Sequence, residues 1–175
     1  MEIHLKGYIH VYTGNGKGKT TAAFGLALRA AGAGLKIYIA QFVKGMKYSE
    51  LNSIERFNDL ITLKQYGRNC FIKKNPEQED IDIAQKGFEE VKKIIHSGKF
   101  NIVILDEINI AVFYNLIDEK DVLELMQNKP EQVELIITGR YATPNIIELA
   151  DLVTEMKELK HYYQKGVKAR AGIER

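Results

Sequence analysis

The sequence has little capacity for sulfur chemistry, with one cysteine, Cys70, in 175 residues, and it has no tryptophan. A single cysteine cannot form an internal disulfide, which fits a reducing compartment. The four histidines show no spacing typical of metal ligands, and with one cysteine a zinc cluster is excluded. Cys70 itself fits a bystander thiol better than a nucleophile, because no histidine is linked to it in the sequence.

The sequence also lacks an excess of charge of either sign and any long apolar run. Lys and Arg total 25 against 23 Asp and Glu, so the net charge of +2 requires neither a nucleic-acid nor a membrane partner. The longest apolar runs, such as residues 102–105, are far too short to cross a bilayer, and residues 1–4 lack the features of a signal peptide. We therefore expect a cytoplasmic protein in which any anion site is local.

Apolar runs alternate with segments of helical periodicity, which is typical of a parallel sheet flanked by helices. A hydrophobic content of 45% is sufficient to form a core, and we predict a single α/β domain over residues 1–175. The expected strands cover residues 8–12, 36–42, 61–65, 101–106, 133–137 and 152–156. The expected helices cover residues 19–33, 49–58 and 118–129, with a short helix opening at Thr143-Pro144.

One further helix has signals at both ends. Asn75 is expected to cap it, Pro76 suits its first position, and Gly98 is expected to stop it. Its apolar residues recur at spacings of three and four and give one buried stripe: Ile81, Ala84, Phe88, Val91 and Ile95.

The segment between the first strand and the first helix is rich in glycine. Gly14, Gly16 and Gly18 let the backbone curl so that successive N–H groups point into one concavity, which is typical of a phosphate-binding loop. Lys19 adds a point charge, and the Thr20 hydroxyl is placed to bind a magnesium ion carried by the phosphates. A glycine-rich turn with chance lysines is the alternative, but strand, loop and helix follow in the required order.

The loop departs at one position from the usual P-loop pattern. That pattern has glycine where this chain has Thr13, and here the glycine comes one step later, at Gly14. A phosphate loop with a magnesium ligand indicates a nucleotide, but it does not indicate which bond breaks. Kinase, hydrolase and alkyl-transfer chemistry therefore all stay open.

Polar residues follow three other predicted strands, at the edge where parallel sheets bind ligands. Asp106 and Glu107 come directly after a buried strand, so a carboxylate here could hold magnesium, with an ordinary helix cap or surface pair as the alternative. Arg140 could meet phosphate or pair with a carboxylate. Gln41 and Lys44 follow the second strand in the same way.

Two residues and one segment have open roles. Arg29 could face the nucleotide or the solvent, and Phe71 could stack on a flat ligand or simply pack. Residues 157–175 show neither helical nor strand periodicity and carry six Lys or Arg. They fit a solvated tail or a functional lid.

The chain resembles the P-loop-type ATP:corrinoid adenosyltransferases from near residue 8 to the C-terminus. The matching blocks are YTGNGKGKTTAAFG (residues 12–25), QFVKG (41–45), VILDE (103–107), ITGR (137–140), ADLVTEMK (150–157) and GVKARAGIE (166–174). The shifted glycine beside Thr13 is a feature of this family's loop. The resemblance implies a P-loop NTPase-like fold of the RecA type.

The resemblance also implies a reaction. In a cob(I)alamin or cob(I)yrinic acid a,c-diamide adenosyltransferase, the cobalt(I) of a reduced corrinoid attacks the ribose 5′ carbon of ATP, and inorganic triphosphate leaves. The corrinoid is the nucleophile, so no activated side chain is required. Magnesium as the cofactor, a flavoprotein as the reductant and a homodimer are also implied. A small P-loop kinase or ATPase and a non-catalytic corrinoid or nucleotide carrier are the alternatives.

By the same resemblance, one run of residues binds the triphosphate of ATP: Gly14, Asn15, Gly16, Lys17, Gly18, Lys19, Thr20 and Thr21. Lys19, Thr20 and Glu107 are then the catalytic residues, and Thr20 and Glu107 hold magnesium. Arg29 is a further candidate for a nucleotide contact.

The corrinoid side of the resemblance rests on fewer residues. Phe71 matches a family aromatic residue that packs at the corrinoid, but Lys73 stands where a second aromatic residue is expected. The departure leaves open how the lower face of the corrinoid is shielded. Residues 157–175 are expected to form a C-terminal active-site or interface segment.

Overall fold

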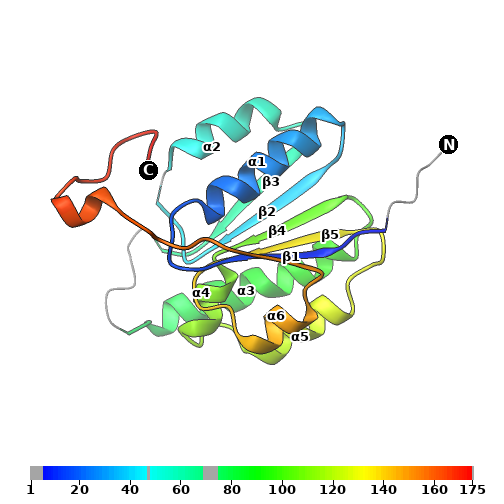
Figure 1. Ribbon diagram of the computed structural model, residues 1–175. Coiled ribbons are helices and arrows are strands. Elements are labelled where there is room, and N and C mark those ends of the chain that lie inside the picture. The colour runs from blue at the N-terminus through cyan, green and yellow to red at the C-terminus, as the bar shows by residue number, and fades with distance from the viewer. Residues whose placement is uncertain (1–5, 47, 69–74, 175) are drawn as a thin grey trace.

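The computed structural model describes residues 6–46, 48–68 and 75–174, which are built around a six-stranded sheet (Figure 1). The strands lie in the order β3-β2-β4-β5-β1-β6, and every neighbouring pair is parallel. Their bounds are β1 Ile9–Thr13, β2 Ile37–Phe42, β3 Ile61–Tyr66, β4 Ile102–Asp106, β5 Glu134–Thr138 and β6 Leu152–Glu155. The predicted α/β fold is confirmed.

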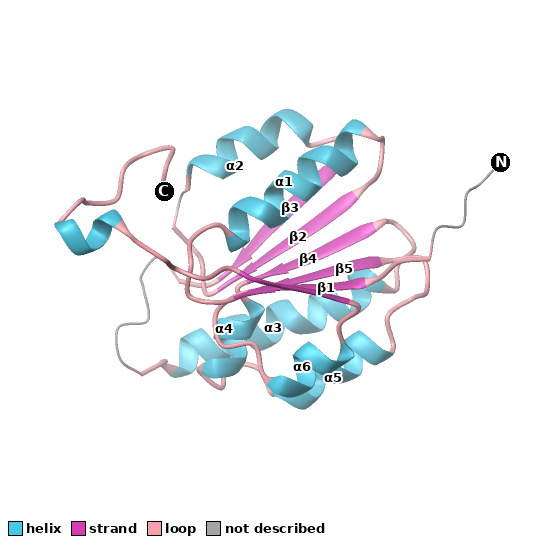
Figure 2. Ribbon diagram, viewed as in Figure 1, coloured by secondary structure: helices cyan, strands magenta, loops and turns pink. Residues whose placement is uncertain are grey.

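Helices cover both faces of this sheet (Figure 2). One face carries α1 (Lys19–Gly32) and α2 (Ser49–Ile54), and the other carries α3 (Gln78–Ile95), α4 (Ile108–Phe113), α5 (Glu119–Gln127) and α6 (Pro144–Leu149). Two short 3₁₀ helices, η1 (Glu55–Phe57) and η2 (Tyr162–Lys165), complete the described structure. No helix within the described ranges is long and apolar enough to cross a membrane.

Burial explains why apolar runs marked the strands so well. Every residue of β2 and β4 is buried, because these central strands have helices over both faces. α1 approaches the sheet closely through small side chains, with Ala23 and Ala27 fully buried against the isoleucines of β2, β4 and β5. Because all the strands are parallel, their carboxyl ends meet at one edge of the sheet, next to the loop that joins β1 to α1 (Figure 1).

The start of α3 differs from the prediction. The helix begins at Gln78, so Pro76 lies before it and Asn75 does not cap it. Glu77 is the cap, in a reciprocal arrangement in which the Glu77 N–H donates to Asp80 at 2.9 Å. This pairing satisfies two backbone donors that a single Asn75 cap would leave open. At the other end α3 stops at Ile95, three residues before Gly98.

α4 was missed by the sequence analysis. Its six residues, INIAVF, follow β4 after a single residue, and their one polar side chain, Asn109, is too little to give an amphipathic period. Three of its side chains, Ile108, Ala111 and Val112, enter the core below the sheet. A hexapeptide with five apolar residues directly after a strand carries no periodicity that would distinguish helix from strand.

Gly87 gives a stability prediction for this fold. Its Cα faces the ring of Tyr66, and a Cβ atom here would fall inside van der Waals distance of the ring carbons. Tyr66 cannot move away easily, because its hydroxyl bonds that of Tyr38 at 2.7 Å in the core. Gly87→Ala should therefore lower the free energy of unfolding by about 2 kcal/mol. Chemical denaturation of both proteins measures the change.

Gly25→Ala is the matched control for that measurement. Gly25 also lies inside a helix, α1, but no atom lies within 4 Å of the position of its Cβ. The higher helix propensity of alanine should make this variant more stable by up to about 1 kcal/mol. Equal unfolding curves for Gly87→Ala and the wild type would show that α3 and β3 are not packed as described.

Candidate active site

The loop between β1 and α1 forms the first part of the site. Gly14 and Gly18 adopt positive φ values of 93° and 118°, which glycine adopts without strain. Lys19 opens α1, and its ammonium folds back to donate to the carbonyls of Gly14 at 2.8 Å and Gly16 at 2.7 Å. Lys19 is only 7% exposed, and this burial lowers the pKa of its ammonium from the ordinary value. The loop thus holds a buried cation next to the N-terminus of a helix.

The backbone after β6 supports this loop from behind. A Cβ atom on Gly14 or Gly16 would lie 2.5 or 2.6 Å from the carbonyl oxygen of Met156, so both positions need glycine for the close approach. The Gly16 N–H donates to that same oxygen at 2.6 Å. One N–H of the predicted phosphate nest therefore holds the loop in place and does not point into the concavity.

Asp106 is the centre of the second part of the site. The strand register brings Gln41 beside Asp106, because β2 and β4 are paired at these positions. Its carboxylate is fully buried and accepts four side-chain hydrogen bonds. The donors are Thr20 at 2.8 Å, Thr138 at 2.8 Å, Lys44 at 2.8 Å and Gln41 at 3.1 Å. This hub connects the loop to three strand ends.

Lys44 places a positive charge at this hub. Its ammonium lies 2.8 Å from Asp106 Oδ2 and 3.2 Å from Thr20 Oγ1. Burial alone would lower the pKa of Lys44, but the charge and the hydrogen bond of Asp106 reverse this and raise it. The hub therefore holds a cation between the threonine hydroxyl and the carboxylate.

Glu107 lies beside the hub in an uncommon backbone conformation. Its φ is 61°, which is rare for a residue other than glycine and is typical of functional sites. Its N–H donates to the Thr138 hydroxyl at 3.0 Å, and its side chain lines the cavity described below. Burial first, and then the neighbouring charge of Asp106, raises the pKa of Glu107. A cation bound here would favour the ionised form of this carboxyl.

The loop, the exposed side of the hub and several other segments line a cavity of about 1050 Å³. Its walls are residues 15–21 of the loop, apolar side chains of α1, α2 and η1, residues Lys44, Glu107 and Arg140, and part of the C-terminal segment. Phe24, Leu28 and Phe57 give the cavity an apolar part, beside the charged residues of the loop. A site with a charged end and an apolar wall suits a ligand that carries both phosphates and a flat ring.

A family model described as ATP:corrinoid adenosyltransferase BtuR/CobO/CobP matches residues 5–175. This chain belongs to that family. It is 40% identical to a corrinoid adenosyltransferase of Sinorhizobium sp, with 97% of this chain and 80% of the relative covered. The corrinoid adenosyltransferase of Escherichia coli (strain K12) is 36% identical, with 97% of this chain and 86% of the relative covered.

A solved structure of low identity matches the fold. It is a KaiC-like protein of Pyrococcus horikoshii OT3, with a TM-score of 0.61 and 16% identity over 89% of this chain and 75% of that chain. At this identity the match speaks for the fold alone. It agrees with the predicted α/β fold of a parallel sheet flanked by helices, and the family match makes this chain a corrinoid adenosyltransferase, an enzyme.

The structure places the predicted nucleotide residues of this adenosyltransferase in two groups. Residues 15–21 line the cavity, together with Glu107. Gly14 and Arg29 are not among the lining residues, and Arg29 is exposed on α1. Phe71, like Cys70 and Lys73, lies outside the described residues, so its predicted corrinoid contact stays a prediction.

The two predicted metal ligands, Thr20 and Glu107, both line the cavity. The Thr20 hydroxyl donates to Asp106, and Glu107 lies next to that carboxylate on the cavity side. The sequence analysis placed Gln41 at this edge without assigning it a partner, and it missed the roles of Thr138 and Met156. Polar residues directly after buried strands were the available signal for Gln41 and Thr138, whereas Met156 contributes only a backbone carbonyl and offers no signal in its side chain.

Proposed function

We propose that this adenosyltransferase transfers the 5′-deoxyadenosyl group of ATP to the cobalt(I) of a reduced corrinoid. Cobalt supplies the electron pair of the new cobalt–carbon bond, the bond between C5′ and the triphosphate oxygen breaks, and inorganic triphosphate leaves with that bond's electrons. The observation that carries this proposal is that the glycine-rich loop, Lys44 and Glu107 line one cavity in a member of this family. The corrinoid is the nucleophile, so the protein has to bind, orient and stabilise charge.

Lys19 is the residue best placed to stabilise the leaving triphosphate. Its ammonium now donates to two loop carbonyls, and a phosphate oxygen in the cavity would replace one of these acceptors. Negative charge grows on the triphosphate as the C5′–O bond breaks, so a fixed cation at this point lowers the barrier. The N–H groups at the start of α1 add to this effect.

We further propose that Thr20, Asp106 and Glu107 hold magnesium. Hydroxyl and carboxylate oxygens are the ligands that this ion prefers. Thr20 and Glu107 line the cavity, and the buried Asp106 lies behind them, hydrogen-bonded to Thr20 and next to Glu107 in the chain. The ammonium of Lys44 is already bound between Thr20 and Asp106, which supports a preference of this cluster for cations. When bound, magnesium would neutralise part of the charge of the triphosphate.

The setting of the reaction is part of the same proposal. We expect a cytoplasmic homodimer that obtains cobalt(I) with the help of a flavoprotein reductant and serves adenosylcobalamin biosynthesis or salvage. The corrinoid adenosyltransferases that match most of this chain support a role in adenosylcobalamin biosynthesis or salvage. The nearly balanced charge gives no reason to expect a nucleic-acid or membrane partner.

To test the proposed transfer, the protein is mixed with ATP, magnesium and a chemically reduced corrinoid. Loss of the cobalt(I) absorption, formation of a light-sensitive alkylcobalt product and release of inorganic triphosphate in equal amounts are expected. ADP or single phosphates as products would indicate a kinase or ATPase instead. Bound corrinoid with unchanged ATP would indicate a carrier.

A further inference from the structure

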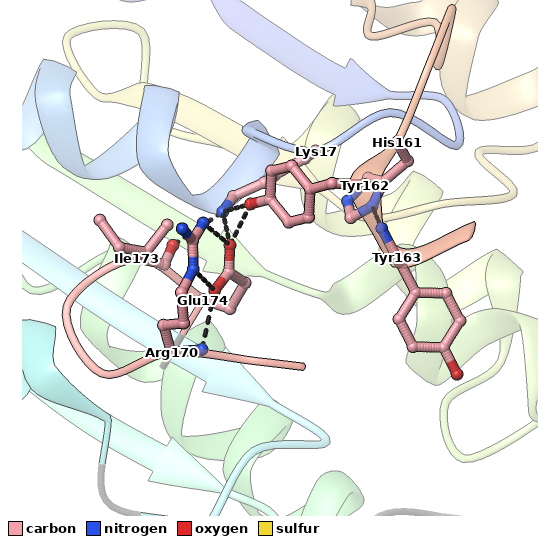
Figure 3. Close-up of polar contacts among 7 residues, drawn as sticks. All are labelled: Lys17, His161, Tyr162, Tyr163, Arg170, Ile173 and Glu174. Carbon is pink, nitrogen blue, oxygen red and sulfur yellow. Dashed lines mark hydrogen bonds and ion pairs between the residues drawn. The ribbon is translucent and has the colours of Figure 1, made fainter. Parts of the chain in front are cut away.

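The ammonium of Lys17 points toward the C-terminal segment (Figure 3). It donates to the Ile173 carbonyl at 2.8 Å, to Glu174 Oε1 at 2.9 Å and to the Tyr162 hydroxyl at 3.2 Å. A lysine ammonium has three N–H donors, and these three acceptors use all of them. Lys17 therefore has no donor left for a phosphate in this arrangement.

Glu174, which accepts a hydrogen bond from Lys17, is also the centre of several contacts within the C-terminal segment. Its carboxylate accepts from the Arg170 N–H at 2.8 Å and from the Arg170 guanidinium at 3.2 Å, and the Tyr162 hydroxyl also donates to it. The guanidinium lies 5.0 Å from the centre of the Tyr162 ring. Arg170, Tyr162 and Lys17 together hold the pKa of Glu174 well below its usual range, so the carboxylate stays ionised at neutral pH.

Residues 170–174, which we call the C-terminal wall, are next to the nucleotide site. Gly172, Ile173 and Glu174 line the same cavity as the loop residues 15–21. The Ile173 side chain is 56% exposed and is the apolar part of this surface. Figure 1 shows the chain leaving β6, extending beyond the sheet and then turning back to end in this wall.

The sign of the charge on Glu174 requires an explanation. A carboxylate in the lining of a site for a polyphosphate would by itself weaken binding of that anion. Here it lies between two cations, Lys17 and Arg170, and it connects the loop to the wall through the loop's own lysine. A structural link of this kind compensates for the unfavourable charge if the wall contributes to holding the ligand.

We propose that Lys17 and Glu174 are positioning residues that hold the C-terminal wall against the phosphate loop, and that the wall retains bound ATP in the cavity. Lys17 then acts on the nucleotide through the wall and does not contact a phosphate. The inference rests on the ATP site proposed above. It differs from the predicted role of Lys17 as a triphosphate ligand.

Glu174→Gln tests the proposal because two explanations of Glu174 predict opposite changes in the affinity for ATP. If Glu174 were only a nearby negative charge, the neutral glutamine would tighten ATP binding. If Glu174 holds the wall, the variant should bind ATP about fivefold more weakly, because a charge-assisted link has been lost. Calorimetry with ATP and magnesium gives the affinity, and hydrogen exchange of residues 162–174 without nucleotide reports directly on the wall. Exchange there should become faster in the variant.

Lys17→Met, alone and combined with Glu174→Gln, distinguishes a Lys17 that holds the wall from a Lys17 that contacts a phosphate. Under the proposal, Lys17→Met weakens ATP binding to the same extent as Glu174→Gln, and the double variant is no weaker than either single variant. Additive losses, or a loss of affinity for inorganic triphosphate in Lys17→Met alone, would instead make Lys17 a phosphate ligand. Glu148→Gln, at an exposed position on α6, is the matched control and should change neither measurement.

Failure of this inference can be distinguished from failure of the proposed function. A wild-type protein that binds no ATP would overturn both. A wild-type protein that binds ATP, together with a Glu174→Gln variant of unchanged or tighter affinity or unchanged exchange, would overturn the inference alone. Slower exchange of the wall upon addition of ATP to the wild type is the expected result, and unchanged exchange would count against retention by the wall.

Discussion

Lys19→Ala should lower the rate of adenosyl transfer by at least about 10²-fold while leaving the fold intact. The ammonium of Lys19 lies at the charged end of the cavity and is the loop cation nearest to the carbonyls that a phosphate would replace. Its removal takes away a charge that acts on the developing triphosphate. The measurement is the single-turnover rate of alkylcobalt formation at saturating ATP and cobalt(I) corrinoid, so that weaker ATP binding cannot account for the loss.

Two comparisons make this prediction specific. Lys93→Ala removes an exposed lysine on α3 and should leave the rate unchanged. Chemical denaturation of Lys19→Ala should agree with the wild type within about 1 kcal/mol, because the cost of burying the ammonium offsets the two hydrogen bonds that the variant loses. A rate close to that of the wild type would contradict the role assigned to Lys19 in stabilising the leaving group.

The strands and the phosphate loop were predictable because their signals are local. A central parallel strand is buried on both faces, so β2 and β4 appear as uninterrupted apolar runs. The strand, loop and helix around Gly16 also follow one another directly in the chain. Both bounds shifted by one residue at β1 and β5, and one bound shifted by one residue at each of the other four strands, because apolar composition does not mark the last hydrogen bond of a ladder.

The hub around Asp106 could be predicted only in outline. Thr20, Gln41, Asp106 and Thr138 come from separate elements, and the sheet order β2-β4-β5 is what brings them together. The sequence pattern indicated that polar residues meet at this edge, but it did not say which carboxylate faces Thr20. Strand order depends on the packing of all the helices, so no single motif contains it.

The contacts of Lys17 could not be predicted from the sequence. Its partner Glu174 is 157 positions away in the sequence and belongs to a segment without any periodicity. Residues 157–175 fitted a tail or a lid by composition, and the structure places residues 172–174 in the lining of the cavity. Side-chain hydrogen bonds between an irregular segment and a loop have no sequence signature, since they depend on the path of the chain after β6.

Asp106→Asn should lower the free energy of unfolding by about 3 kcal/mol and also abolish the effect of magnesium on ATP binding. Four donors converge on the fully buried carboxylate of Asp106. A carboxamide offers one acceptor oxygen in place of two, so its NH₂ group would face donors from Lys44 and Gln41. The Lys44 ammonium would also lose its counter-charge. Chemical denaturation and ATP titrations with and without magnesium measure the two effects.

A second substitution identifies the cause of this instability. If the uncompensated ammonium is responsible, Lys44→Met should recover part of the lost stability in the Asp106→Asn background, although the same change destabilises the wild type by breaking the ion pair. Asp59→Asn, at an exposed aspartate, is the control and should change stability by less than about 0.5 kcal/mol. Wild-type stability in Asp106→Asn, or a double variant less stable than the sum of the two single changes, would show that the hub is not held together by this charge. Recovery of stability in the double variant without recovery of the magnesium effect would separate the two roles of Asp106. Removing the Lys44 ammonium restores the charge balance of the hub, but it does not restore the carboxylate oxygen that would bind magnesium.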